Sequence, residues 1–198
     1  LGKPSASGFP GESAGLLSHY SNWRPISQAT LAYGYGLSMT PLQLAQAYAI
    51  IGSGGLRRPV SLIRVEEAPI PRRVIREDVA REVLTMLETV VGPEGTGRAA
   101  NVRNYRVAGK TGTARKIAPG GYAENRFVAV FAGLAPASAP RLAAVVVVDD
   151  PRGDEYYGGT VSAPVFAQIM EGALRILAVP PDNFVVEDST ATFAARAE

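Results

Sequence analysis

Three extended segments that follow one another closely are the feature that most constrains the fold. They cover residues 104–117, 126–135 and 141–149, and they are rich in β-branched, aromatic and small apolar residues. Connections this short join antiparallel neighbours, because a parallel pair needs a crossover of a dozen or more residues. Residues 142–148 are apolar throughout, which is typical of a strand buried on both faces. The sequence therefore predicts an antiparallel sheet.

Three helices are predicted around this sheet. The first begins at Thr40-Pro41, a hydroxyl N-cap followed by proline at the first helical position, and ends at Gly52. The second covers residues 77–91, with acids in its first turn and apolar residues along one face. The third is expected to have Ser162 as its N-cap and a broad apolar face. Strands with helices on their faces make an α/β layered domain.

The remaining segments are predicted to hold no long regular element. Residues 1–25 are rich in Gly, Ser and Pro and are typical of a loop. Residues 57–76 alternate apolar and charged side chains around prolines, which favours edge strands and loops. Residues 92–97 are predicted to be a turn, since a helix C-terminus presents carbonyls and not amides to a ligand. The domain is expected to span residues 1–181, with residues 182–198 as a C-terminal tail.

Composition excludes several classes of function. The net charge of +2 and the lack of a basic run argue against nucleic-acid binding. The sequence has no cysteine and a single histidine, His19, so a zinc site built from Cys and His is excluded, and no cofactor is expected. His19 is predicted to be a surface loop residue. No apolar stretch approaches the ~20 residues that a membrane-spanning helix needs.

The candidate site is the tetrapeptide Lys110-Thr111-Gly112-Thr113 in the first strand. Glycine weakens a strand interior and usually marks the close approach of a ligand or another backbone, and Gly109 and Gly112 flank the lysine. An ammonium and two hydroxyls beside unpaired edge amides can bind a carboxylate and stabilise a developing oxyanion.

Two other interpretations of this tetrapeptide stay open. The phosphate-binding pattern G-x-x-x-x-G-K-[ST] ends in the same residues, but its first glycine falls on Asn104 and the residues after Thr111 are extended, not helical. The simplest alternative is an ordinary strand that carries a solvated lysine.

Several separated segments, taken together, resemble the penicillin-binding transpeptidases. Lys-Thr-Gly-Thr is followed in the family's order by residues 120–136 and 149–159, and Phe9-Pro-Gly-Glu resembles the turn after the family's second catalytic motif. The resemblance runs from about residue 8 to residue 183 and is closest to the class B septal enzyme of Gram-negative bacteria. It implies the β-lactamase/transpeptidase-like fold, an antiparallel sheet covered by helices, of which this chain would be the C-terminal portion.

The resemblance implies a D,D-transpeptidase that cross-links peptidoglycan stem peptides during cell division and is a target of β-lactams. In the family a serine within S-x-x-K attacks the penultimate D-alanyl carbonyl, and the acyl-enzyme then passes its acyl group to an amine. Neither S-x-x-K nor S-x-N occurs in this sequence, and the nearest pattern, Thr113-Ala-Arg-Lys116, overlaps the strand motif. The serine, its lysine and the second motif are therefore expected outside these residues.

The resemblance also assigns roles to the strand motif. Lys110 would attract the substrate carboxylate and join the proton relay, and the hydroxyls of Thr111 and Thr113 would bind that carboxylate. The backbone N–H of Thr113 would donate to the oxyanion, and the small Gly112 would let substrate lie along the strand.

Further substrate-binding candidates are side chains on the neighbouring loop and hairpin: Arg115, Tyr122, Tyr156 and Tyr157. For the tyrosines, local packing is the open alternative, and for Arg115 it is a solvated surface position.

Partners and location follow from the resemblance as well. The expected partners are stem peptides and β-lactams, the missing N-terminal part of the same domain, and division-complex membrane proteins including a glycosyltransferase. The expected location is the periplasmic face of the inner membrane, with an anchor upstream. Two alternatives stay open: a serine β-lactamase or penicillin sensor, and a non-catalytic interaction domain of the same fold.

Overall fold

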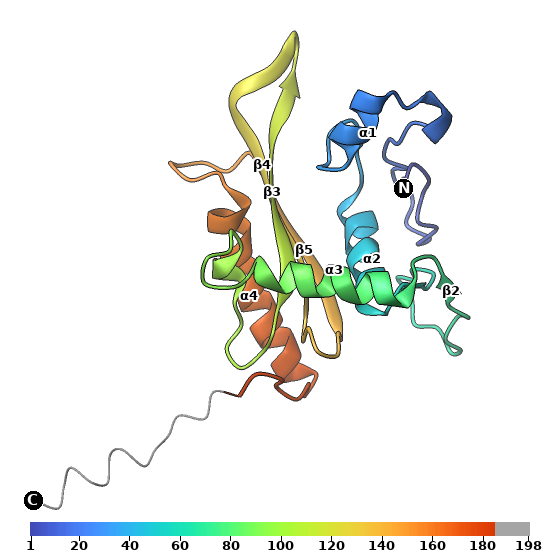
Figure 1. Cartoon of the computed structure of the whole chain (residues 1–198), viewed down its shortest axis with the longest axis vertical. Coiled ribbons are helices and arrows are strands. Elements are labelled where there is room, and N and C mark those ends of the chain that lie inside the picture. The colour runs from blue at the N-terminus through green and yellow to red at the C-terminus, as the bar shows by residue number, and fades with distance from the viewer. Residues whose placement is uncertain (185–198) are drawn as a thin grey trace, which may run out of the picture.

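A three-stranded antiparallel sheet lies at the centre of the computed structural model, which describes residues 1–184 (Figure 1). The strands are β3 (Ala108–Ala118), β4 (Gly121–Ala135) and β5 (Leu142–Asp149), in that order across the sheet. Both pairs are antiparallel, which confirms the predicted sheet. β4 begins at Gly121 and not at residue 126, because the β3–β4 pair continues beyond the sheet as a hairpin arm, defined here as residues 115–127 (Figure 1).

Helices cover both faces of the sheet. α4 (Gly158–Ile176) packs on one face, where Phe131, Phe166 and Met170 form a buried core. α2 (Pro41–Gly52) and α3 (Glu77–Thr89) pack on the other face around Leu134. Phe131 and Leu134 are fully buried, and a side chain of this size contributes about 1.5–3 kcal/mol of burial free energy. The helices and the sheet confirm the predicted α/β layered architecture.

The apolar strand β5 is less buried than predicted. Alternate residues do contact the two cores, with Val146 on the α4 side and Val145 on the α2 side. None of its residues is fully buried, however, and Val147 is 41% exposed. The reason is that β5 lies at an edge: within residues 1–184, β4 is its only strand partner. An apolar run therefore predicted the strand correctly but not its position in the sheet.

α2 begins where its sequence predicts. The hydroxyl of Thr40 accepts from the Gln43 N–H at 3.1 Å, and Gln43 Oε1 accepts from the Thr40 N–H at 2.9 Å, so a complete capping box is present. Gln43 also donates to the carbonyls of Lys3 and Ala14, which ties the N-terminal segment to the helix. The helix ends at Gly52, as predicted.

The prediction that Ser162 caps the last helix is wrong. α4 begins at Gly158, with Tyr157 as its N-cap, and Ser162 lies inside the helix and is fully buried. The helix starts early because Thr113 of β3 accepts a hydrogen bond from the Gly158 N–H at 3.1 Å. A Cβ at Gly158 would lie 2.2 Å from the carbonyl oxygen of Val130, so only glycine permits this close contact with the sheet.

The N-terminal region holds two short helices that the sequence did not predict, η1 (Tyr20–Asn22) and α1 (Pro25–Leu31). His19 precedes η1 and is exposed, as predicted. Residues 9–12 form a turn closed by the Glu12 N–H and the Phe9 carbonyl at 3.3 Å. Hydrogen bonds from Ser5 and Ser7 lower the pKa of the Glu12 carboxyl to about 2.

The other connections agree with their predictions. β1 (Leu56–Arg57) and β2 (Arg72–Arg73) form a short antiparallel pair, and the turn after α3 leads to η2 (Arg98–Ala100). Among the helices of residues 1–184, none combines the length and the apolar character that crossing a membrane requires.

The first residue of the predicted tail is attached to the domain. The Asp182 carboxylate accepts from the Arg106 N–H at 2.7 Å and from the Ser138 hydroxyl at 2.6 Å. Most of that tail, residues 185–198, lies outside the described part of the chain. The boundary at residue 181 stays a prediction.

Candidate functional site

The motif at 110–113 lies on the outer edge of β3. Within residues 1–184, β3 pairs only with β4, so its other edge carries no strand. The ammonium of Lys110 donates to the carbonyl of Thr111 at 3.1 Å, so that carbonyl faces the open edge. In an antiparallel pair the N–H and C=O of one residue point to the same side, and the side alternates along the strand. The backbone N–H of Thr113, two residues on, therefore faces the open edge as well.

Lys110 and the two threonines leave β3 on opposite faces, because side chains alternate along a strand. Thr111 and Thr113 lie on the α4 side. A Cβ at Gly159 would lie 3.5 Å from Thr111 Cγ2, and the Gly158 N–H donates to Thr113 Oγ1. Lys110 starts from the other face, and its ammonium reaches around the edge to 3.4 Å from Thr111 Oγ1. The cation and the hydroxyls therefore meet at the edge itself.

The two hydroxyls already have partners. Thr113 Oγ1 accepts from the Gly158 N–H at 3.1 Å, and Thr111 Oγ1 lies 3.0 Å from Thr96 Oγ1. A hydroxyl has one proton and two lone pairs. Because Gly158 occupies a lone pair of Thr113, the proton of Thr113 is free to be donated to an anion.

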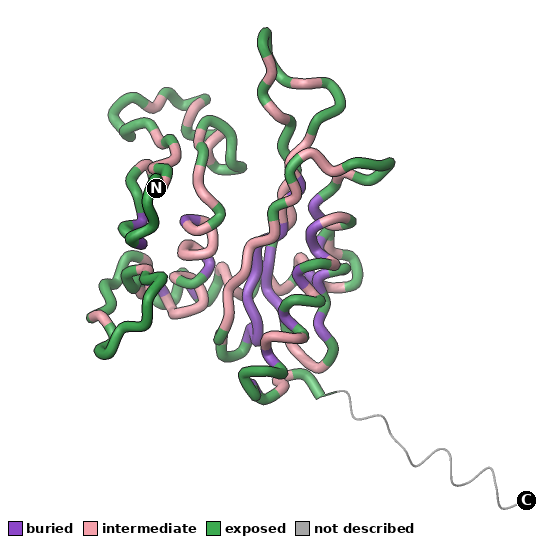
Figure 2. Tube along the Cα trace, turned by 180° about the vertical axis from the view of Figure 1, so that it is seen from behind, coloured by how far each residue is buried: buried purple, intermediate pink, exposed green. Residues whose placement is uncertain are grey.

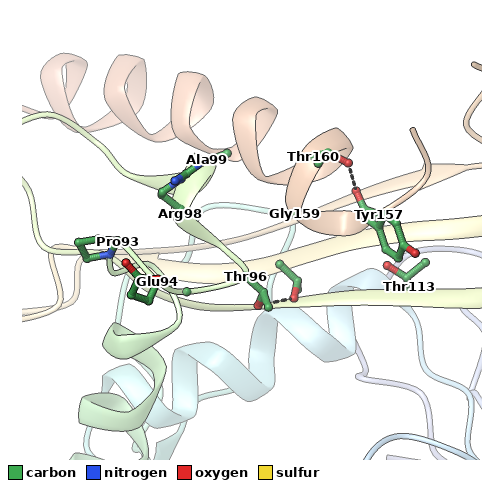
Figure 3. Close-up of a pocket in the computed structure, with 11 residues that line it drawn as sticks. Pro93, Glu94, Thr96, Arg98, Ala99, Thr113, Tyr157, Gly159 and Thr160 are labelled. Carbon is green, nitrogen blue, oxygen red and sulfur yellow. Dashed lines mark hydrogen bonds between the residues drawn. The ribbon is translucent and has the colours of Figure 1, made fainter. Parts of the chain in front are cut away.

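A cavity of about 780 Å³ opens beside these hydroxyls. Its lining comes from three segments: the turn after α3, strand β3 and the start of α4 (Figure 3). Thr111, Thr113 and Tyr157 are among the lining residues, whereas Lys110 is not and stands at the rim through its contact with Thr111. A cavity of this size lies within the usual range for small-molecule sites, about 300–1,000 Å³.

An aromatic cluster stands next to the cavity. The ring of Tyr156 stacks on that of Phe127 with centroids 4.0 Å apart, and the Tyr156 hydroxyl donates to that of Tyr157 at 3.1 Å. This hydrogen bond raises the pKa of Tyr156. The guanidinium of Arg115 lies 6.0 Å from the centroid of Phe127. The structure therefore brings together three of the four predicted loop and hairpin residues.

The fourth of these residues, Tyr122, lies apart. It pairs with Ile117 near the tip of the hairpin arm, is 58% exposed and does not line the cavity.

Two ion pairs link the hairpin arm to the last residue of β5 and to the loop that follows it. Arg126 Nη2 lies 2.8 Å from Asp150 Oδ2, and Lys116 Nζ lies 2.6 Å from Asp149 Oδ1. The hydrogen bond from Arg126 lowers the pKa of the Asp150 carboxyl. Tyr156 lies further along the same loop, and its stacking on Phe127 is a third contact between the loop and the arm.

Three residues of the site were missed in the sequence. Phe127 lies within a predicted strand, Thr96 within a predicted turn, and Gly158 before the predicted helix start. Only Gly158 carried a local signal, the Gly158-Gly159 pair, because paired glycines permit close backbone approach. Within residues 1–184, no group of His, Cys, Asp and Glu is arranged to hold a metal ion.

The chain belongs to the penicillin-binding protein transpeptidase domain family, because the sequence model of that family matches residues 1–171. It is 48% identical over 189 residues to "Peptidoglycan D,D-transpeptidase FtsI" of Escherichia coli K12, which covers 95% of this chain and 32% of that protein. It is 46% identical over 181 residues to "Probable peptidoglycan D,D-transpeptidase PenA" of Neisseria meningitidis Z2491, covering 91% of this chain and 31% of that protein. The family resemblance inferred from the motifs is thereby confirmed.

Solved structures agree with the fold. The transpeptidase domain of Burkholderia pseudomallei penicillin-binding protein 3 superposes with a TM-score of 0.86 at 46% identity, over 92% of this chain and 56% of that one. The predicted transpeptidase-like fold is therefore confirmed. The chain spans about a third of the length of the curated relatives it matches.

Proposed function

We propose that this chain forms one wall of the active site of a class B penicillin-binding protein, a peptidoglycan D,D-transpeptidase of cell division and a target of β-lactams. One observation carries the proposal. One edge of β3, which carries no strand within residues 1–184, brings together the Lys110 ammonium, the hydroxyls of Thr111 and Thr113 and the outward amide of Thr113 beside a cavity. The nucleophilic serine would come from a part of the protein outside these 198 residues, which contain no S-x-x-K.

The edge would bind the terminal carboxylate of a stem peptide or the carboxylate of a β-lactam. Lys110 supplies positive charge at the edge, and the free hydroxyl proton of Thr113 supplies a directed donor. Hydrogen bonds to a charged group are roughly twice as strong as neutral ones. Gly112 leaves the strand without a side chain between the two threonines, so an extended peptide can lie beside it as an added strand.

The same edge would stabilise the transition state of acyl transfer. When the serine attacks the carbonyl carbon, negative charge develops on the carbonyl oxygen, and the Thr113 N–H would donate to it. The pairing of β3 with β4 fixes this amide before substrate arrives, so no reorganisation is needed at the moment of reaction. Loss of one such donor typically costs about 2.7–4 kcal/mol in the transition state.

The aromatic cluster would contact the side chains of the substrate or the drug. Tyr157 lines the cavity directly, and Tyr156 and Phe127 support it from behind by stacking. Arg115 would add positive charge at this end of the edge. Tyr122, near the tip of the hairpin arm, would meet only a long substrate.

The proposal extends to the location and the partners of the protein. The protein would act at the periplasmic face of the inner membrane, held by an anchor upstream of this chain. It would work with division-complex membrane proteins, including a glycosyltransferase, and with the rest of its own transpeptidase domain. The names of the relatives, "Peptidoglycan D,D-transpeptidase FtsI" and "Probable peptidoglycan D,D-transpeptidase PenA", support the activity on which these expectations rest.

Labelling of the complete protein with a fluorescent penicillin tests the proposal. We expect a stable adduct on the wild type and a strong loss of labelling in Lys110→Ala. Lys116→Ala is the matched control. It also removes an ammonium from β3, but the ammonium of Lys116 pairs with Asp149 and does not face the motif. The 198 residues alone should form no covalent adduct.

Each alternative has its own outcome in that experiment. An unlabelled wild type would leave only the non-catalytic interaction domain. A label that is rapidly released would favour a β-lactamase.

A further inference from the structure

A threonine in the turn after α3 faces the strand motif. Thr96 Oγ1 lies 3.0 Å from Thr111 Oγ1, and both residues line the cavity (Figure 3). We propose that Thr96 is a positioning residue: it donates its hydroxyl proton to Thr111, so that the proton of Thr111 points at the substrate carboxylate. This inference rests on the proposed function and adds a group that the strand motif itself does not contain.

The backbone holds Thr96 firmly in this place. A Cβ at Gly95 would lie 2.0 Å from the carbonyl oxygen of Val90, and a Cβ at Gly97 would lie 2.9 Å from the ring of Phe131. The Gly97 N–H donates to the Val90 carbonyl at 2.8 Å. The two glycines therefore let the turn lie directly against the end of α3 and the ring of Phe131, and this packing places the residue between them.

Contact with α4 fixes the other side of Thr96. A Cβ at Gly159 would lie 2.3 Å from the Thr96 carbonyl oxygen and 3.5 Å from Thr111 Cγ2. The start of α4 therefore packs directly on both threonines. Thr96, Thr111 and Gly159 meet at one corner of the cavity, although their segments lie far apart in the sequence.

Counting protons determines the direction of the hydrogen bond. Thr111 Oγ1 carries one proton and has two lone pairs, and the ammonium of Lys110, 3.4 Å away, can only donate to it. A carboxylate can only accept, so it must take the Thr111 proton. Thr96 is then left as the donor to the second lone pair of Thr111. If Thr111 donated to Thr96 instead, it would present lone pairs to the anion and repel it.

The arrangement parallels that of Thr113. There the Gly158 N–H occupies a lone pair of the hydroxyl and leaves its proton for the anion. A series of donors that ends on an anion also strengthens each hydrogen bond in it. Thr96 differs from Gly158 in one useful respect: it donates through its side chain, so a substitution can remove the donor without moving the backbone.

The test uses the complete protein and two D-alanyl thioester substrates, one with a free terminal carboxylate and one with the matched carboxamide. For Thr96→Val we expect kcat/KM to fall about three- to tenfold for the carboxylate substrate, the effect of one hydrogen bond, and to stay within about twofold for the carboxamide. Thr96→Ala should give the same change in the ratio of the two rates, and Thr96→Ser should restore the wild-type ratio.

Thr85→Val is the matched control, since its hydroxyl bonds the Arg81 carbonyl within α3. Equal losses for both substrates, or an unchanged rate with the carboxylate, would refute the role of Thr96 while leaving the proposed function intact. A wild-type protein that turns over neither substrate would overturn the proposed function, and this inference with it.

Discussion

The two ends of the β3–β4 pair differ sharply in how they are held. Near the motif, helices cover the pair on both faces, and Ala108 and Leu134 are fully buried. In the hairpin arm no helix of residues 1–184 covers the same two strands, and Ile117 is 86% exposed (Figure 2). Ion pairs and ring stacking hold the arm, whereas a packed core holds the motif.

The difference indicates that the two ends of the β3–β4 pair suit different roles. Groups that must stabilise a transition state have to be fixed before substrate arrives, and a packed core fixes them. Side chains that only contact the outer part of a substrate tolerate a looser attachment. In the proposed function, the Thr113 amide belongs to the first kind, and Arg115 and Tyr122 belong to the second.

The largest expected effect comes from weakening the covered end. Phe131→Ala removes a fully buried ring from the core between the sheet and α4 and should lower the free energy of unfolding by about 3–5 kcal/mol. Tyr122→Ala in the hairpin arm should change it by no more than about 0.5 kcal/mol, as expected for an exposed site. Urea denaturation of the complete protein measures both. Similar losses for the two variants would remove the contrast between the ends.

A second prediction concerns the contact between α4 and the motif. In Gly158→Ala the new methyl group would lie 2.2 Å from the Val130 carbonyl oxygen, so the helix start must shift and Thr113 loses its donor. We expect a loss of about 1–3 kcal/mol in stability, with slower acylation by penicillin. Gly172→Ala, in the same helix but with open space around it, should instead stabilise the protein by about 0.5–1 kcal/mol. Thermal unfolding and acylation rates distinguish the two, and a neutral Gly158→Ala would contradict the tight contact.

The smallest effect is expected in the arm. The pKa of Asp150 is lowered by Arg126, so its contribution to stability is present above the unfolded-state value of about 3.9 and is lost as the pH falls through the lower folded-state pKa. Arg126→Ala should raise the pKa of Asp150, and concentrated salt should weaken the pair because it is exposed. Carboxyl chemical shifts followed by NMR during an acid titration report this pKa. An unchanged value in Arg126→Ala would show that the pair does not hold the arm.

The sequence predicted those structural features that are determined by neighbouring residues, and it failed for features that depend on residues far apart in the chain. The cap at Thr40-Pro41 and the extended run around Lys110 are decided within a few residues, and both were predicted correctly. The start of α4 is decided by Thr113, which lies far away along the chain, so Ser162 was a misleading signal. The exposure of β5 depends on sheet order, which no apolar run reveals.

The residues of the candidate site also fall into these two groups, those predicted from a local pattern and those placed by folding. The strand motif and the tyrosines of the loop were found from the sequence because they form short patterns. Thr96 and Phe127 reach the site only through folding: the first by a turn whose two glycines lie close against Val90 and Phe131, the second by stacking on Tyr156. Neither carries a motif that would have predicted its position.

The most direct test is a crystal structure of the complete protein acylated by a penicillin. We expect the drug carboxylate to accept hydrogen bonds from the hydroxyls of Thr111 and Thr113, and the acyl carbonyl oxygen to lie about 2.7–3.1 Å from the Thr113 nitrogen. A covalent adduct whose carboxylate and carbonyl oxygen both lie away from the outer edge of β3 would contradict it.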